Sequence, residues 1–307
     1  GPPPPPLICV TECRDTVFEC VIMWSRFASM RTLVNMECMQ GEQMRAWNVQ
    51  DAVSEVRPGV FFVQGPASNW AIFTEAASPR FTLIDSGYPG DRELLLASME
   101  HIGVKLADCA ALLVTHGHSD HIGSAAFLAA QGIPVYAHEL ELANVRREVM
   151  EQITVKDLGL RALAPRVLAW AIHAIRAGGL SDVAVPSVQP LNESALVSLP
   201  GELSAVHTGG HTTGHTAYLD PKRGVLVCGD VLISGHAISP VRGPQLLPEP
   251  FHFAAATVFA AAAGLPWEDF TCLLPGHGPW LDLPEGLAAE GIRSGDYWPF
   301  GTPSGRG

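Results

Sequence analysis

The stretch VTHGHSDHIG, residues 114–123, constrains the fold more than any other, because it places four coordinating side chains within six positions. In an extended segment residues two apart face the same way, so His116, His118 and Asp120 can converge on one side while His121 turns to the other. Burying these groups without a ligand would leave several polar atoms unpartnered. The spacing therefore predicts a metal site and allows one segment to contact two adjacent ions.

The runs around this motif predict strands alternating with helices. The apolar run CAALLVTH predicts a buried strand that ends at the motif. The expected strands are residues 59–65, 69–75, 80–87, 109–116, 133–138, 194–199, 203–210, 216–220, 224–230 and 270–278. The expected helices are residues 91–103, 122–132 and 253–265. Two strand-rich halves, each with helices, indicate one layered α/β domain.

Residues 139–180 depart from this alternation and predict an inserted pair of helices, over residues 139–153 and 165–179. The second helix carries one apolar stripe, formed by Val167, Leu168, Ala171, Ile172 and Ile175. The pair could pack on the sheet, or it could form a cap that shapes a pocket, since inserted segments often carry specificity. Both roles stay open.

Charge and composition limit the kinds of molecule that this chain can be expected to bind. A formal net charge of -12 argues against a surface that holds nucleic acid or an anionic membrane, because clustered Lys and Arg capture such partners. The run VFECVIMWS is too short and too polar to span a bilayer. We therefore expect a cytoplasmic protein that acts on a small-molecule substrate and that could form a homodimer.

The first 47 residues differ from the rest in composition. They hold five of the seven methionines and four of the seven cysteines, Cys9, Cys13, Cys20 and Cys38. We expect residues 1–47 to be a non-native or poorly structured extension and residues 48–307 to be the functional domain. Zinc binding by the four cysteines is the alternative, although their spacing matches no CxxC pair.

THGHSDH resembles the HxHxDH signature of the metallo-β-lactamase superfamily of metal-dependent hydrolases, and three later stretches resemble the family in the same order. These stretches are HTGGHTTGH with His211, LVCGD with Asp230 and LLPGHGP with His277. The resemblance implies a four-layer αβ/βα sandwich with a dinuclear metal centre on one edge. The upstream LIDSG also resembles a family strand, which makes Asp85 a hydrogen-bond partner for a ligand.

Carried over residue by residue, the resemblance divides the ligands between two ions. One ion would be held by His116, His118 and His211. The other would be held by Asp120, His121 and His277, with Asp230 touching both. A set of imidazoles and carboxylates suits Zn²⁺, and Fe or Mn would also tolerate it, so we expect two zinc ions per chain.

Other histidines near these positions need separate roles. His207 and His215 each lie four residues from His211, and only the family pattern selects His211 as the ligand. We expect His215 to be structural or to support a ligand. His236 and His252 lie in the long loop after Asp230 and are candidates for the substrate pocket.

Two metals that share a solvent molecule lower its pKa, so hydrolysis is the expected reaction. Asp120 and Asp230 are the expected catalytic carboxylates, because Asp120 could orient the nucleophile or pass a proton to the leaving group. True metallo-β-lactamases carry Cys or Ser where Asp230 stands, which favours an ester, thioester or lactone over a β-lactam as substrate. A β-lactamase, a persulfide dioxygenase-like enzyme with one iron, and a non-catalytic binding module are the alternatives.

Overall fold

The computed structural model describes residues 48–284, 291–296 and 299–300. The chain divides into two units, Gly1–Asn48 and Val49–Gly307, and the described fold is that of the second. The expected N-terminal extension, with its four cysteines, lies outside the described residues. Among the described residues, we find no helix that combines the length and the hydropathy of a membrane-spanning segment.

Two β-sheets form the centre of this unit. Among the described residues, one sheet has seven strands in the order β1-β2-β3-β4-β5-β6-β7, and the other has five in the order β12-β11-β10-β9-β8. Strands β1 to β4 are antiparallel, whereas β4 to β7 run parallel, as do β10 and β11. The strands are β1 (Val53–Arg57), β2 (Val60–Gln64), β3 (Asn69–Glu75), β4 (Ser78–Ile84), β5 (Cys109–Leu113), β6 (Val135–Ala137), β7 (Gln189–Pro190), β8 (Ser204–His207), β9 (Thr216–Asp220), β10 (Val225–Gly229), β11 (Cys272–Pro275) and β12 (Leu281–Asp282).

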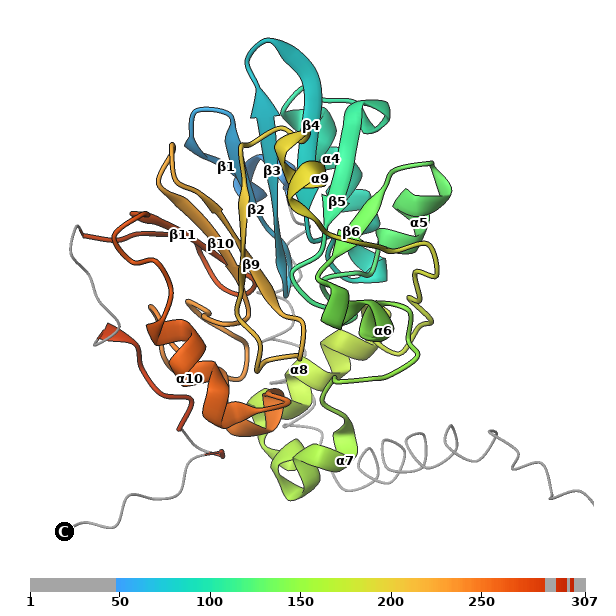
Figure 1. Cartoon of the computed structure of the whole chain (residues 1–307). Helices are drawn as coiled ribbons and strands as arrows, with labels where there is room; N and C mark the ends of the chain where they lie inside the picture. The colour runs from blue at the N-terminus through green and yellow to red at the C-terminus, as the bar shows by residue number, and fades with distance from the viewer. Residues whose placement is uncertain (1–47, 285–290, 297–298, 301–307) are drawn as a thin grey trace, which may run out of the picture. The chain divides into compact units, whose positions relative to one another are not determined.

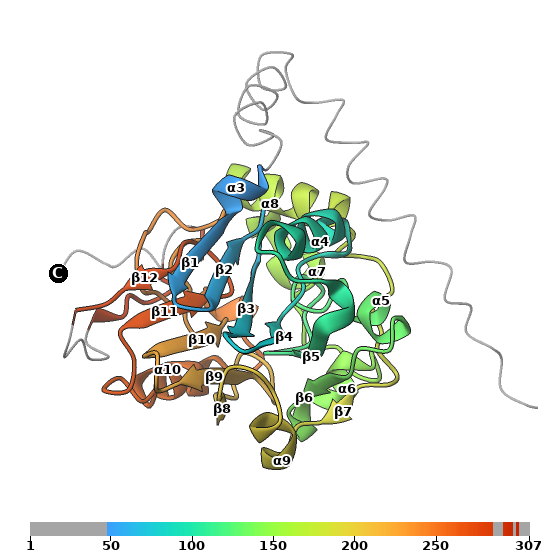
Figure 2. The same cartoon turned by 90° about the horizontal axis from the view of Figure 1, so that it is seen from above.

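Helices cover the outer face of each sheet (Figures 1 and 2). α4 (Arg92–His101) and α5 (Ala125–Ala130) pack on the seven-stranded sheet, and α10 (Ala255–Ala263) packs on the other. The sheets face each other across a third apolar layer. The fold is therefore the four-layer αβ/βα sandwich that the resemblance implies. The remaining short helices and 3₁₀ turns are α3 (Val49–Ala52), Pro89–Asp91, Leu106–Asp108, Glu139–Glu141, α6 (Leu142–Val145), α7 (Val155–Leu158), Gly159–Leu163, α9 (Glu193–Val197) and Glu249–Phe251.

Alternating side chains along the strands build these layers. In β2, Phe62 packs between the sheets while Val63 packs among the residues of α4 and α5. In β10, Val227 points between the sheets, whereas Cys228 is fully buried on the opposite face, with the residues of α10. Because both faces of β2, β5, β10 and β11 are largely buried, these strands are apolar at nearly every position. This explains why they stand out in the sequence.

The ends of four strands lie at one edge of the sandwich. Asp85 follows β4, the THGHSDH loop follows β5, Asp230 follows β10, and His277 follows β11 by two residues. Each of these strands belongs to a parallel pair, β4 with β5 and β10 with β11. Parallel strands present their carboxyl ends together, so the topology gathers these residues at one place.

The inserted segment differs from its prediction in the first half. The expected helix over residues 139–153 is wrong, because α6 ends at Val145 and Arg147 adopts the left-handed backbone region with φ of 61°. The chain then runs irregularly to α7. The second expected helix is present as α8 (Pro165–Arg176), with Pro165 in its first turn.

The expected strand over residues 194–199 is also wrong, since this stretch lies largely in α9. The side chain of Asn192 accepts a hydrogen bond of 2.9 Å from the backbone N–H of Ala195 and so caps the helix. Val197 is 87% exposed, so the apolar residues of this stretch do not form a buried strand face. The cap outweighs the β-propensity of a short run.

Candidate metal centre

All seven residues predicted as ligands meet at the strand-end edge, and each residue as a whole is at most 9% exposed. Their potential ligand atoms form three groups, in each of which the atoms lie within 4.8 Å of one another. The groups are His116, His118 and His211; His116, His121 and Asp230; and Asp120, His121 and His277. The first and third groups are the two sets that the resemblance implies, and Asp230 joins the second.

Asp230 lies between these sets. Its Oδ2 is 3.0 Å from His277 Nε2 and 3.5 Å from His211 Nε2. Its Oδ1 is 3.5 Å from His121 Nε2. The carboxylate therefore reaches histidines of both sets, as a carboxylate shared by two ions must.

The outward nitrogen of each histidine faces a hydrogen-bond acceptor. His118 Nε2 lies 2.8 Å from the Glu151 carbonyl oxygen, and His277 Nδ1 lies 2.7 Å from the Ala67 carbonyl oxygen. His121 Nδ1 lies 2.8 Å from Asp85 Oδ2. In a neutral ring the proton then sits on the outward nitrogen, and the inward nitrogen keeps its lone pair. The surroundings thus set the tautomer that metal binding requires.

His211 reaches the same state through a second histidine. His252 Nε2 lies 3.0 Å from the Leu247 carbonyl oxygen, so this nitrogen donates and His252 Nδ1 accepts. His211 Nδ1 lies 3.0 Å from His252 Nδ1 and is the donor. His211 Nε2 is left as an acceptor, 3.2 Å from His118 Nδ1. His252 therefore orients a ligand from behind.

Unpartnered buried atoms test whether a metal fits. Within the described residues, His116 Nε2, His121 Nε2 and Asp230 Oδ1 are buried and lack a hydrogen-bond partner. Leaving such atoms unsatisfied is costly, and a cation bound between them would remove that cost. Imidazole and carboxylate are ligands that divalent transition metals accept. The residues present therefore fit a divalent metal.

Burial and charge divide the protonation states of the centre. Burial lowers the pKa of His116 and of His211 well below its ordinary value. Burial opposes ionisation of Asp230, but His277 and His121 hold the pKa of its carboxyl well below its usual range. Burial likewise opposes protonation of His121, yet the carboxylates around it, Asp230 first, raise its pKa to about 10. A divalent cation would neutralise the negative charge gathered here.

Asp85 lies where the sequence places it, beside a ligand. Its Oδ1 accepts a hydrogen bond of 2.8 Å from the backbone N–H of Thr115, and its Oδ2 accepts one of 2.7 Å from the Thr115 hydroxyl. The Thr115 hydroxyl in turn lies 3.0 Å from His116 Nδ1. Together with its contact to His121, Asp85 holds two ligands through one carboxylate.

His215 and His236 also border the centre. His215 Nε2 accepts a hydrogen bond of 3.0 Å from the backbone N–H of Asp230, which is consistent with burial lowering the pKa of His215 to about 3. The His236 ring lies 4.8 Å from the His277 ring and 5.8 Å from that of Trp170 on α8, centroid to centroid. His236 thus lies between a ligand histidine and the inserted helix, and its place in a substrate pocket stays a prediction. His215 supports a ligand through the Asp230 backbone.

The sequence model of the metallo-β-lactamase superfamily matches residues 80–277, well over half of the chain. The chain belongs to the metallo-β-lactamase superfamily. The superfamily binds divalent metals, and the His and Asp groups described above are where this member would bind them. The chain is a metallo-hydrolase.

Three proteins of known sequence are similar to this chain over more than half of its length. Uncharacterized protein YobT of Bacillus subtilis is 27% identical over 215 residues, which cover 69% of this chain and 84% of that protein. Probable metallo-hydrolase YflN of the same organism is 28% identical over 229 residues, 71% of this chain and 80% of that protein. Hydroxyacylglutathione hydrolase GloC of Haemophilus influenzae is 27% identical over 183 residues, 59% of this chain and 72% of that protein.

Two glutamates that the sequence does not single out contact the loops that carry the ligands. Glu141 is fully buried and bonds to the loops that carry His118 and His211. The Glu151 carboxylate accepts hydrogen bonds of 2.6 Å from the backbone N–H and from the hydroxyl of Thr213. Both lie in the stretch expected to be a regular helix, where they are two acidic residues among four, so the sequence holds no signal for their roles.

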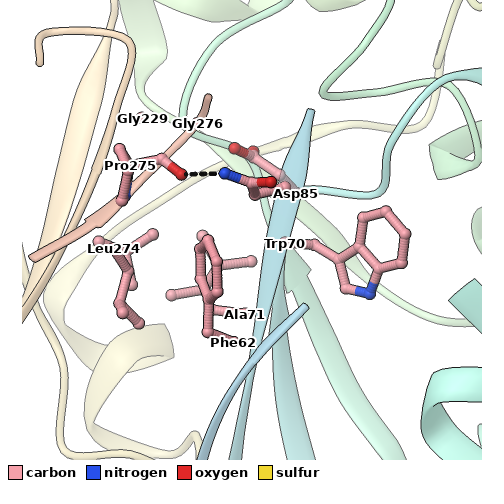
Figure 3. Close-up of a pocket in the computed structure, with 11 residues that line it drawn as sticks. Phe62, Trp70, Ala71, Asp85, Gly229, Leu274, Pro275 and Gly276 are labelled. Carbon is pink, nitrogen blue, oxygen red and sulfur yellow. Dashed lines mark hydrogen bonds between the residues drawn. The ribbon is translucent and has the colours of Figure 1, made fainter. Parts of the chain in front are cut away.

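A small cavity lies between the sheets next to Asp85 (Figure 3). Its wall is mostly apolar, with Phe62, Trp70 and Leu274. Asn69, which also lines the cavity, donates a hydrogen bond of 2.9 Å from its Nδ2 to the Pro275 carbonyl oxygen. Because the Asp85 carboxylate already accepts from Thr115 and His121, the cavity is a packing gap beneath the centre rather than a substrate site.

Proposed function

We propose that this chain is a dinuclear zinc hydrolase of a small carbonyl substrate, which is an ester, a thioester or a lactone. The position of Asp230 carries the proposal. Its two oxygens face histidines of both ligand sets, and the Oδ1 atom is buried without a hydrogen-bond partner in the described structure. Shared carboxylates of this kind are found where two metal ions act on one substrate.

Two metal ions bound here would lower the pKa of a water ligand and supply a nucleophile at neutral pH. The chain itself would manage the proton. Asp120 Oδ2 lies 3.4 Å from His277 Nε2, and its side chain is 13% exposed, against 2% for Asp230. Asp120 is therefore the carboxylate of the centre that a bound substrate can reach, and it can hold a proton or pass it to the leaving group.

The comparison with GloC supports a thioester or related substrate, because that relative is a hydroxyacylglutathione hydrolase. The acidic net charge of -12 supports a small molecule rather than a nucleic acid or an anionic membrane. The inserted helix α8 supports a cap over the site, since its Trp170 lies beside His236, which contacts the His277 ring. We propose that these aromatic and imidazole rings border the substrate.

A hydrolysis panel on metal-quantified protein tests the proposal. The panel contains lactones, thioesters, carboxylic esters, phosphodiesters and β-lactams, together with a persulfide whose oxidation is followed by oxygen uptake. We expect turnover of at least one of the first three classes, with Asp120→Asn and Asp230→Asn each reducing it by orders of magnitude. Asp269→Asn makes the same charge change at an exposed position and should leave turnover unchanged. Turnover confined to the other classes, or unaffected by the Asp230 variant, would contradict the proposal.

A further inference from the structure

The first part of the inserted segment forms hydrogen bonds with the two loops that carry three of the metal ligands. We define the strap as residues 139–152, the first loop as residues 115–121 and the second loop as residues 208–215. The first loop carries His116 and His118, and the second carries His211. These three histidines form one metal-binding group although the loops lie far apart in the sequence. Whatever fixes one loop against the other therefore sets the geometry of this group.

Glu141 of the strap joins the two loops through one carboxylate. Its Oε1 accepts a hydrogen bond of 2.7 Å from the backbone N–H of Gly117, in the first loop. Its Oε2 accepts bonds of 2.8 Å from the Thr212 hydroxyl and 2.9 Å from the backbone N–H of Gly214, in the second loop. Asn144 Nδ2 adds a fourth bond, of 2.7 Å to Oε1. Each end of the carboxylate thus holds a different loop.

Four donors on two oxygens require a carboxylate. An amide or a protonated acid offers acceptors at one end only and would set a donor against the donors at the other end. Glu141 is fully buried, so water cannot replace a lost partner. Burial raises the pKa of Glu141, and the hydrogen bonds, that from Asn144 first, oppose this rise. The surroundings are therefore built around the ionised side chain.

Packing supports the same contact. A Cβ atom on Gly117 would lie 2.9 Å from Asn144 Nδ2, and one on Gly214 would press on the Glu141 backbone. Both loops thus carry a glycine where the strap touches them. Glu151 makes a second connection, because its carbonyl oxygen faces His118 Nε2 while its carboxylate holds Thr213. Both glutamates of the strap therefore contact both loops.

We propose that Glu141 is a positioning residue that fixes the first loop against the second and thereby sets the metal affinity of the His116, His118 and His211 group. It touches neither metal nor substrate. The inference rests on the metal centre of the superfamily and not on the proposed substrate. It gives the inserted segment a role at the centre that is separate from capping a pocket.

The test measures zinc affinity of the full-length, metal-free protein by competition with a chromophoric chelator. His277→Ala disables the group of Asp120, His121 and His277, so binding in that background reports the group held by Glu141. His118→Ala does the reverse. Glu141→Gln keeps the size of the side chain but replaces one acceptor oxygen with a donor. Glu148→Gln is the matched control, because it makes the same charge change at an exposed position of the strap.

We expect Glu141→Gln to weaken zinc binding about 10- to 100-fold in the His277→Ala background. Zinc binding in the His118→Ala background should stay unchanged, and Glu148→Gln should have no effect in either. Thr212→Val removes one donor to Glu141 and should act in the same direction by a smaller factor, which keeps the proposal testable if Glu141→Gln fails to fold. Thermal unfolding of each metal-free variant monitors folding.

Two results would overturn the proposal. One is a Glu141→Gln protein that binds zinc as the Glu148→Gln protein does. The other is an equal weakening in both backgrounds, which would show a general structural role. Because no substrate enters the measurement, a hydrolysis panel without turnover would count against the proposed function and leave this result unaffected.

Discussion

Asp85 is not a predicted metal ligand, but it orients two of the ligands, His121 directly and His116 through Thr115. It adopts the left-handed backbone region, with φ of 61°, which a non-glycine residue takes up only where its surroundings require it. Three donors converge on its carboxylate, two from Thr115 and one from His121. This residue could be predicted from the sequence because it directly follows a strand in a family motif. The roles of Glu141 and His252 could not, since they depend on loops distant in the sequence.

Replacing Asp85 with Asn should weaken the centre while preserving the backbone, because Asn tolerates the left-handed region. The amide can accept at one end only, so either the Thr115 N–H or the pair at Oδ2 loses its acceptor. We expect metal affinity or turnover to fall about 10- to 100-fold. Glu100→Gln, at an exposed position, is the control. Unchanged zinc affinity in the Asp85 variant would show that this carboxylate does not orient the ligands.

Among the elements, the buried strands and the helices α4, α8 and α10 could be predicted from the sequence, whereas the strap could not. Strands such as β2 and β10 are buried on both faces, so local composition identifies them. Residues 139–153 have helical composition, but the backbone of Arg147 has left-handed rather than helical dihedral angles. Its Nη1 donates a hydrogen bond of 2.8 Å to the Gly117 carbonyl oxygen. Contacts with a distant loop outweigh helix propensity there. α9 replaces an expected strand for the local reason of its Asn192 cap.

The turn before α4 contains a carboxyl group whose titration should affect stability. Burial raises the pKa of Asp91 to about 6. A hydrogen bond of 2.9 Å from the backbone N–H of Tyr88 to Asp91 Oδ2 opposes this rise. Because the folded pKa lies above the unfolded value, the folded state binds the proton more tightly. The free energy of unfolding is therefore unaffected by Asp91 below the pKa of the unfolded state. It falls as the pH rises from that pKa to the pKa of the folded state, and Asp91 causes no further loss above it.

Asp91→Asn removes this ionisation and keeps an oxygen to accept from Tyr88. We expect the variant to gain free energy of unfolding over the wild type, and the gain should be larger at pH 7.5 than at pH 5 by about 1 kcal/mol. Urea unfolding of the metal-free proteins at the two pH values measures it. A gain that is equal at both values, or larger at pH 5, would contradict the raised pKa.

At the scale of the whole molecule, the centre is assembled from both sheets. The first sheet supplies the residues after β4 and β5, and the second supplies those after β10 and β11 (Figure 1). The sequence predicts the seven ligands because each stands in a short motif that resembles the superfamily, and for His211 only this resemblance selects the ligand. It does not predict how the loops are held together, because that depends on tertiary contacts of Glu141, Glu151 and His252.

Metal should therefore stabilise the entire fold. A ligand that binds only the folded state raises stability by RT ln(1 + [L]/Kd), which is about 4 kcal/mol at a free concentration 1,000 times Kd. We expect chelation to lower the Tm and added Zn²⁺ to restore it, with a smaller shift for Asp230→Asn. Calorimetry or fluorescence-monitored unfolding measures the shift. The same Tm with and without chelator would count against metal binding by residues of both sheets.

We propose that two metal ions, held by the seven side chains, perform the hydrolysis. A titration of metal-free protein with Zn²⁺ tests this proposal, with the bound metal per chain and the turnover of a hydrolysed substrate measured on the same samples. We expect turnover to reach its maximum at two zinc ions per chain, and the Asp230→Asn protein to stay below this maximum at every stoichiometry. Maximal activity with one iron per chain, or activity independent of bound metal, would show that a dinuclear zinc centre does not perform the hydrolysis.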